Sequence, residues 1–257
     1  FEWLQKGTFA MVDLWLYNFS RNIPDLLEGK SVKTLSVFNS SNPLNKNQKS
    51  NGSAIVIGAG PSLYEKNHLE LLVNSDYDGT VLLTDSMLKR CLKIGINPDR
   101  FSNFFVLTID PYLFTANFYD DEIIKKYGKK IKCILSSCTS PDTVKICKNN
   151  DLDIFWFHPL IDDYRKLESI SKIMNLMTKS EINPKGFPGL QTAGNVGAFS
   201  WIFSWAILGK SPTALIGLNL GYLGDTKIEN TQHYDELLKV CDNPEDVTKK
   251  YRKIFNT

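Results

Sequence analysis

Residues 53–63, Ser-Ala-Ile-Val-Ile-Gly-Ala-Gly-Pro-Ser-Leu, constrain the fold more than any other stretch of this 257-residue chain. The apolar, β-branched first half is typical of a buried parallel strand, and it runs directly into a tight turn. Gly58 and Gly60 can adopt backbone angles closed to other residues and let a ligand approach the main chain. Pro61 and Ser62 suit the first turn of a helix, where the hydroxyl could cap the helix or contact a phosphate. The stretch predicts a phosphate-facing turn between a strand and a helix, or an ordinary turn without a ligand.

The chain continues as an alternation of short apolar runs and helix-compatible stretches. The predicted strands are 55–57, 80–83, 104–109, 131–135, 154–157 and 213–217. The predicted helices are 2–28, 63–74, 87–94, 116–127, 141–147, 163–178 and 194–208. Such alternation predicts an α/β fold: a Rossmann-like, mostly parallel sheet flanked by helices, with an N-terminal helical extension.

Composition divides the chain into four parts. Residues 39–52 lack periodicity and are rich in turn-forming Asn, Ser and Pro, so we interpret them as a linker. We expect a helical extension at 1–38 before this linker and a Rossmann-type domain at 53–235 after it. A C-terminal helix is expected within 236–257, because Asn243-Pro-Glu provides a cap, a proline at the first position and an early acid.

Charge and cysteine content narrow the function classes. The net charge is +2, from 30 basic and 28 acidic residues, which is too balanced for a nucleic-acid-binding field. Five cysteines without a Cys-x-x-Cys pair indicate reduced thiols and a cytoplasmic protein. The longest apolar stretch, 198–208, is too short to span a membrane. We therefore expect small-molecule partners, while the composition leaves the oligomeric state open.

Small or polar residues follow each predicted strand, which is where ligands bind in parallel sheets. These strand ends are 58–62, Asp85-Ser86, Asp110-Pro111, Ser136-Ser137, His158 and 218–222. Six such ends in a row favour a nucleotide-type cleft over a purely structural sheet.

Several of these residues have more than one role open to them. The Asp110 carboxylate could bind a ribose, orient an acceptor, hold a metal or cap a turn. Asp85 and Ser86 could hydrogen-bond a base or ribose, or Asp85 could cap the following helix. Ser137 could line a phosphate or base pocket.

A second small-residue turn, Thr192-Ala-Gly-Asn-Val-Gly197, opens the most apolar predicted helix. Free N–H groups near Gly194 and Asn195 suit an anion, whereas the alternative is close helix packing. His233 lies in a polar loop. It could act as a general acid or base, or it could be a solvated side chain without a catalytic role. The sequence has no zinc-type spacing, and Leu63 interrupts a Gly-x-Gly-x-x-Gly pattern, which argues against a dinucleotide oxidoreductase.

Six short motifs follow one another in a defined order. They are Gly58–Leu63, Asp85–Lys89, Gly95–Asp99, Thr108–Pro111, Gly194–Gly197 and Leu215–Tyr222, with His233 after them. Across about residues 17–235 they resemble the archaeal 6-hydroxymethylpterin diphosphokinase-like (MptE-like) family, which includes the central domain of the motility accessory factor flagellin glycosyltransferases. The first motif also resembles the Gly-x-Gly-Pro-Ser loop of a bacterial sialyltransferase family that uses CMP-sugars.

The resemblance implies a nucleotide-dependent transferase, with a CMP-activated nonulosonic sugar as the first candidate donor. The nucleotide would lie across 58–62 with help from Asn219 and Tyr222, and Asp110 or His233 would handle the proton.

Two alternatives remain. One is transfer of diphosphate from ATP to 6-hydroxymethyl-7,8-dihydropterin with Mg²⁺, for which the family's kinases would carry a Thr-Asp-x-Asp-Gly cluster. Here the cluster reads Thr108-Ile-Asp-Pro, so Asp110 is the one acid that could meet a metal there. The other alternative is a nucleotide-binding module without catalysis.

Overall fold

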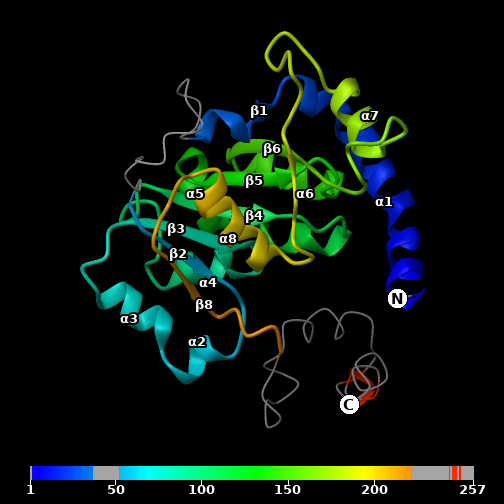
Figure 1. Ribbon diagram of the computed structural model, residues 1–257. Helices are drawn as coiled ribbons and strands as arrows, with labels where there is room; N and C mark the ends of the chain where they lie inside the picture. Colours follow the sequence, from blue (N-terminus) through cyan, green and yellow to red (C-terminus); the bar gives the residue numbers. More distant parts are fainter. Residues whose placement is uncertain (1, 37–51, 222–242, 244, 248, 250–257) are drawn as a thin grey trace.

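The computed structural model describes residues 2–36, 52–221, 243, 245–247 and 249 (Figure 1). This part of the chain forms an eight-stranded sheet in which all paired strands run parallel. Its strands are β1 (Lys30–Ser31), β2 (Ala54–Ile57), β3 (Thr80–Thr84), β4 (Phe104–Thr108), β5 (Lys132–Ser136), β6 (Asp153–Pro159), β7 (Gly189–Leu190) and β8 (Thr213–Ile216). The predicted α/β fold with a mostly parallel sheet is confirmed.

The strand order is β1-β6-β5-β4-β3-β2-β8, with β7 paired to the end of β6. From β2 to β6 the chain adds each strand beside the previous one in a single direction. It then returns to place β8 on the other side of β2, where Ile57 lies level with Ile216 on one neighbour and Leu83 on the other. The strand order therefore reverses at β2, which is where open α/β sheets bind ligands at the carboxyl ends of their strands.

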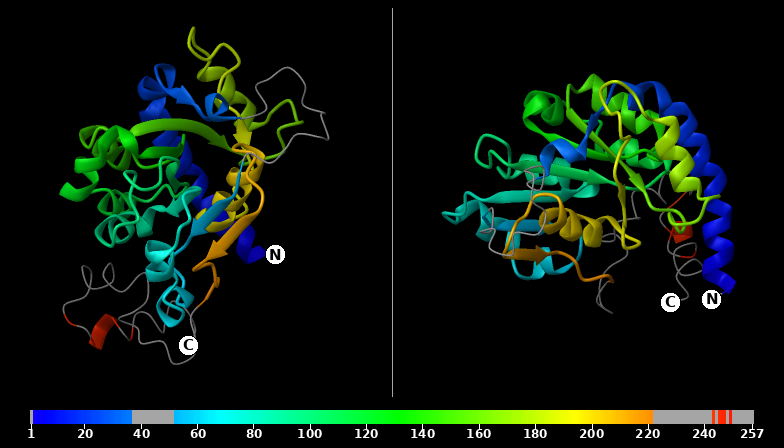
Figure 2. Two further views of the ribbon diagram at one scale, coloured as in Figure 1. Left: turned by 90° about the vertical axis from the view of Figure 1, so that its left-hand side faces the viewer. Right: turned by 45° about the horizontal axis from the view of Figure 1, so that its top comes forward.

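The helices cover both faces of the sheet (Figure 2). They are α1 (Glu2–Leu27), α2 (Ser62–Glu65), α3 (His68–Asn74), α4 (Leu88–Lys93), α5 (Glu122–Tyr127), α6 (Pro141–Asn149), α7 (Ile170–Met177) and α8 (Val196–Ala206), with short 3-10 turns η1 (Val32–Leu35), η3 (Asp85–Met87), η4 (Leu113–Phe118) and η5 (Gly128–Lys130). Val81 and Leu83 point into the core shared with α1 to α7. Leu82 points to the other face, against Phe199 and Phe203 of α8. Alternate strand residues thus feed two cores, which explains why the strands read as continuous apolar runs.

The N-terminal helix α1 is present as predicted, and the chain after it joins the sheet, because Lys30 and Ser31 pair with β6. None of the helices within the described ranges is long and apolar enough to cross a membrane.

Three predicted helices are shorter or broken in the structure. The segment 63–74 forms α2 and α3, because Asn67 between them adopts a left-handed φ of 49°. In the predicted helix 116–127, α5 begins only at Glu122, where the Asp121 carboxylate accepts the Ile123 N–H. The predicted helix 163–178 begins at Ile170, because the Asp162 carboxylate accepts the N–H groups at its start.

Two strands, β1 and β7, were not predicted, since two residues are too few to produce a periodic pattern. Most of the predicted linker, together with Tyr222 and His233, lies outside the described residues.

Candidate functional site

The turn after β2 and the turn after β8 are hydrogen-bonded to each other along their length. The Gly58 N–H donates to the Ile216 carbonyl at 2.9 Å, and the Gly60 N–H donates to the Gly217 carbonyl at 2.7 Å. The Ser62 N–H then donates to the side-chain oxygen of Asn219 at 3.2 Å. Predicted site residues from two distant parts of the chain therefore lie together at the point where the strand order reverses.

Glycine is required in these turns because the backbones approach so closely. A Cβ at Gly60 would overlap the Asn219 side-chain oxygen and lie 2.7 Å from the Gly217 carbonyl oxygen. A Cβ at Gly58 would overlap the side chain of Leu218, and so would a Cβ at Gly197. The motifs at 58–63, 194–197 and 215–222 therefore meet around Leu218. Close packing explains part of their glycine content.

The starts of the two adjoining helices are built differently. Pro61 stands at the cap position of α2 with an ordinary helical φ of −62° and no side-chain cap. Asn195 caps α8, its side-chain oxygen accepting the Ala198 N–H at 2.8 Å. Gly194 before it has a φ of +79°, and no atom in the described part of the chain lies within 4 Å of the place where its Cβ would stand. The described residues therefore leave room beside the turn at the start of α8.

Asp85 lies at the carboxyl end of β3 with only 2% of its surface exposed. One oxygen accepts the Thr108 hydroxyl at 2.9 Å, and the other accepts the Ser86 N–H at 2.8 Å. Burial, and secondly the negative charge of Asp110, raise the pKa of Asp85 to about 7 against the lowering effect of these two hydrogen bonds. The half-buried Asp110 at the end of β4 is therefore electrically close to Asp85. A buried carboxyl with a raised pKa beside a second carboxyl is a feature of functional sites.

The end of β3 is also tied to the end of β2. The Thr84 hydroxyl lies 3.4 Å from both the Ile57 carbonyl oxygen and the Ser86 hydroxyl. This places the predicted Ser86 next to the glycine turn, so the ends of β8, β2, β3 and β4 form one continuous edge.

Ser137 lies apart from this edge and is fully buried. Its hydroxyl is 2.8 Å from Nδ1 of His158, whose Nε2 is 2.9 Å from the Thr178 hydroxyl. The Thr178 hydroxyl donates to the Met174 carbonyl, so Nε2 of His158 must carry the proton and Nδ1 must accept from Ser137. Burial, and secondly the charge of Lys33, lower the pKa of His158 to about 4. The Ser137 hydroxyl donates its hydrogen bond to the neutral His158, so it is not free to donate to a ligand.

Helix α1 closes the carboxyl ends of β4 and β5 above this histidine. The Asn18 amide donates to the carbonyls of Pro111 and Cys138 at 2.8 and 3.0 Å. The Asn22 amide, one turn later, donates to the carbonyls of Ser137 and Thr139 at 3.1 and 2.8 Å. Sequence reasoning missed this cover, although two asparagines four residues apart in an apolar helix were a visible signal. Helix α1 therefore covers the segments that follow β4 and β5, from Pro111 and Ser137 onward.

Among the described residues, no three His, Cys, Asp or Glu side chains come together as they would to hold a metal. The four cysteines in this part of the chain are free and buried, and burial raises the pKa of Cys91 and of Cys138 to about 12. These thiols are inert core groups rather than ligands or nucleophiles.

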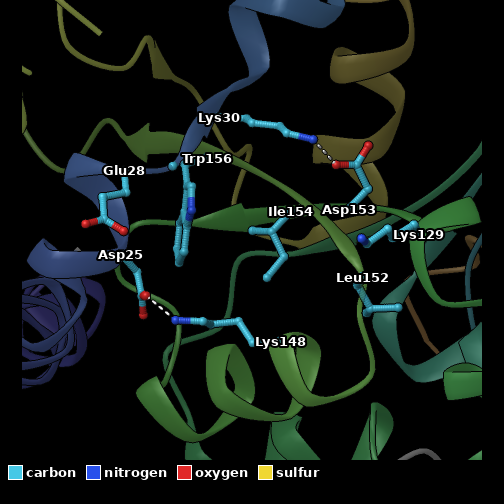
Figure 3. Close-up of a pocket in the computed structure, with 10 residues that line it drawn as sticks. Asp25, Glu28, Lys30, Lys129, Lys148, Leu152, Asp153, Ile154 and Trp156 are labelled. Atoms are coloured by element: carbon cyan, nitrogen blue, oxygen red, sulfur yellow. Dashed lines mark hydrogen bonds and ion pairs between the residues drawn. The ribbon is translucent and has the colours of Figure 1, made fainter. Parts of the chain in front are cut away.

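A hollow of about 500 Å³ opens at the opposite end of the sheet, where β6 begins (Figure 3). Two ion pairs, Lys30–Asp153 and Lys148–Asp25, cross its walls at 2.5 Å each. Trp156 and Ile154 form its apolar floor. None of the predicted site residues lines it, and it faces away from the carboxyl ends of the strands.

The parallel sheet, its strand order and the helices on both faces define a Rossmann-like α/β protein. A family model described as "6-hydroxymethylpterin diphosphokinase MptE-like" matches residues 17–225. The chain belongs to this family, and the resemblance stated from its motifs is confirmed. Searches of curated proteins and of solved structures returned no significant match. Family membership supports a nucleotide-related transferase.

Proposed function

We propose that this protein is a glycosyltransferase that binds a CMP-activated nonulosonic sugar at the edge formed by the ends of β8, β2, β3 and β4. The proposal depends above all on one observation: three hydrogen bonds join the glycine turn at 58–62 to residues 216–219, at the point where the strand order reverses. The likeness of the 58–63 motif to a CMP-sugar loop suggests the kind of nucleotide.

In the proposed reaction, the bond between the anomeric carbon and the phosphate oxygen of the donor breaks, and CMP leaves with the electron pair. The acceptor hydroxyl oxygen forms the new bond to the anomeric carbon and loses its proton to a carboxylate, for which Asp110 is the candidate. The N–H groups near Gly194 at the start of α8 would stabilise the negative charge on the departing phosphate. His233 is a second candidate for the proton and lies outside the described residues.

The alternative reaction is the one in the family's name, diphosphate transfer from ATP to a hydroxymethylpterin with Mg²⁺. Phosphate oxygens of the nucleotide would supply most of the metal ligands in that case, because Asp110 is the one acid in its motif. A non-catalytic nucleotide-binding module is the third reading.

A thermal-shift panel of CMP, CDP, UDP, ATP and a hydroxymethylpterin, each with and without Mg²⁺, separates these readings. Stabilisation by CMP without a need for Mg²⁺ supports the glycosyltransferase. Stabilisation by ATP only with Mg²⁺, and none by cytidine nucleotides, supports the kinase and contradicts our proposal. Cytidine binding with no release of CMP from any CMP-sugar, over a panel of acceptors, supports the binding module.

A further inference from the structure

Buried polar side chains form a continuous row of hydrogen bonds that runs from the core of the sheet to Asp85. We call this row, Asp85–Thr108–Tyr119–Cys133, the file. The Thr108 hydroxyl lies 2.9 Å from the Asp85 carboxylate and 2.7 Å from the Tyr119 hydroxyl. The Cys133 sulfur lies 3.8 Å from the same phenol oxygen, and Cys147 lies 3.9 Å further on. Thr108 and Tyr119 are both fully buried. Solvent water therefore does not reach these two hydroxyl groups, so it cannot replace a hydrogen bond that is lost.

The ionised state of Asp85 fixes the direction of every bond in this file. A carboxylate can only accept hydrogen bonds, so the Thr108 hydroxyl must use its one hydrogen to donate a hydrogen bond to Asp85. Tyr119 must then donate to Thr108, and the Cys133 thiol can donate weakly to Tyr119.

The protonated state of Asp85 can be accommodated by reversing the same bonds. A neutral Asp85 can donate to the Thr108 oxygen, Thr108 can donate to the Tyr119 oxygen, and the phenol can turn its proton towards the Cys133 sulfur. Each oxygen of the file keeps a partner in both states. A buried carboxyl with a valine or alanine in place of Thr108 would lack such a partner in either state.

The groups that face Asp85 come from several elements, and they have different charges. Asp110, from the segment after β4, is the charged group whose repulsion acts on it. Burial raises the pKa of Tyr119, and that of Cys147 on α6, well above their ordinary values, so both are neutral at pH 7. Asp85 is thus the member of this group that can change its charge near neutral pH.

We propose that Asp85 is the proton-holding group of the candidate site, and that Thr108 and Tyr119 act as a reorienting hydroxyl pair that keeps its carboxyl hydrogen-bonded in both protonation states. This inference deepens the proposed function and rests on it for its purpose: Asp85, in place of the Asp110 named above, takes the proton lost by the acceptor hydroxyl. Its carboxylate becomes a neutral carboxyl, and the proton returns to solvent after CMP has left. Tyr119 and Thr108 are positioning residues in this scheme, since both are buried behind Asp85.

The test is a ¹³C NMR titration of the aspartate carboxyls in the full chain, with the Asp85 signal assigned through Asp85→Asn. We expect the wild-type signal to titrate near neutral pH. Thr108→Val should raise the midpoint by about one pH unit, because the hydrogen bond that is lost is stronger to the charged carboxylate than to the neutral carboxyl. Tyr119→Phe should raise it less, and Asp110→Asn should lower it. Thr108→Ser, which keeps the hydroxyl, should restore the wild-type midpoint.

A midpoint near the ordinary aspartate value of about 4 in the folded wild type would overturn the inference. So would midpoints in Thr108→Val and Tyr119→Phe that equal the wild-type midpoint. Backbone chemical shifts in the same spectra show whether each variant is folded, and Thr108→Ser provides the conservative comparison. The titration needs no ligand, so failure of CMP to bind would contradict the proposed function and leave this result standing.

Discussion

The side-chain oxygen of Asn219 accepts the backbone N–H of Ser62 at 3.2 Å, which ties the turn after β8 to the start of the helix after β2. The same oxygen occupies the space that a side chain at Gly60 would need. The glycine turn at 58–62 therefore packs against the turn at 217–219, and this contact determines which residues position 60 can contain.

Gly60→Ala should lower the free energy of unfolding by about 1–3 kcal/mol, because the new methyl group meets the Asn219 oxygen and the Gly217 carbonyl. Urea unfolding followed by circular dichroism measures the change. Gly221→Ala is the matched control, since among the described residues, its chain neighbours aside, no atom lies within 4 Å of its added methyl group. It should stay within about 0.5 kcal/mol of wild type. Equal losses in the two variants would contradict the close packing described for Gly60.

Asn22→Ala should cost about 2–3 kcal/mol, because it leaves the buried carbonyls of Ser137 and Thr139 without their donor. Ser20→Ala on the exposed side of the same helix removes only a local bond to the Tyr17 carbonyl and should be nearly neutral. Denaturant midpoints compare the two variants directly. If Asn22→Ala were as stable as Ser20→Ala, α1 would not be the cover of the β5 end that the structure indicates.

Asp85 should make the protein less stable as the pH rises. Its folded pKa of about 7 exceeds the ordinary 3.8, so the folded state binds more protons between these values. The stability that this neutral carboxyl provides is complete below about pH 4 and is lost by pH 7, a change of roughly 4 kcal/mol. Asp85→Asn should remove this contribution, so that the variant gains stability from pH 4 to 6.5 through His158 and is more stable than wild type at pH 7–8. The exposed Asp76→Asn should keep the wild-type profile, and an Asp85→Asn profile parallel to that of the wild type would refute the assignment.

His158 should have the opposite effect in an overlapping range. Its folded pKa of about 4 lies below the ordinary 6.5, so the unfolded state binds more protons between them. Acidification from pH 6.5 to 4 should remove roughly 3 kcal/mol of stability, which offsets the gain from Asp85 over most of that interval. His158→Gln should uncover the Asp85 trend as a steeper rise in stability on acidification. Parallel stability profiles for His158→Gln and wild type would contradict a buried neutral histidine.

The sequence was sufficient for most of the sheet, because a parallel strand buried on both faces is a continuous apolar run, as in Val81–Leu83. Helix boundaries were harder to predict. Asp162 shows why: its carboxylate bonds to the start of α7 from eight residues away, which moves the start of that helix to Ile170. The strand at Lys30 could not be found, since two residues leave no periodic pattern and its partner β6 is distant in the chain.

The candidate site was predictable where it consists of strand-end turns. Gly60, Ser62 and Asn219 were singled out from the sequence and do lie together, although their part in ligand binding stays a prediction. The partnership of Asp85 with Tyr119 was beyond sequence reasoning, because it passes through Thr108 and exists only once η4 has packed on β4. Tertiary hydrogen bonds of this kind leave no periodic trace in the chain.

Calorimetric titration of CMP into the wild type, Gly60→Ala and Ser20→Ala tests the central claim most directly, after circular dichroism has confirmed that each is folded. We predict that CMP binds the wild type and Ser20→Ala, which lies on the exposed side of α1, with equal affinity. It should bind Gly60→Ala at least about tenfold more weakly, which corresponds to about 1.4 kcal/mol. A folded wild type that gives no heat with CMP, or a Gly60→Ala variant with unchanged affinity, would contradict a nucleotide site at this edge of the sheet.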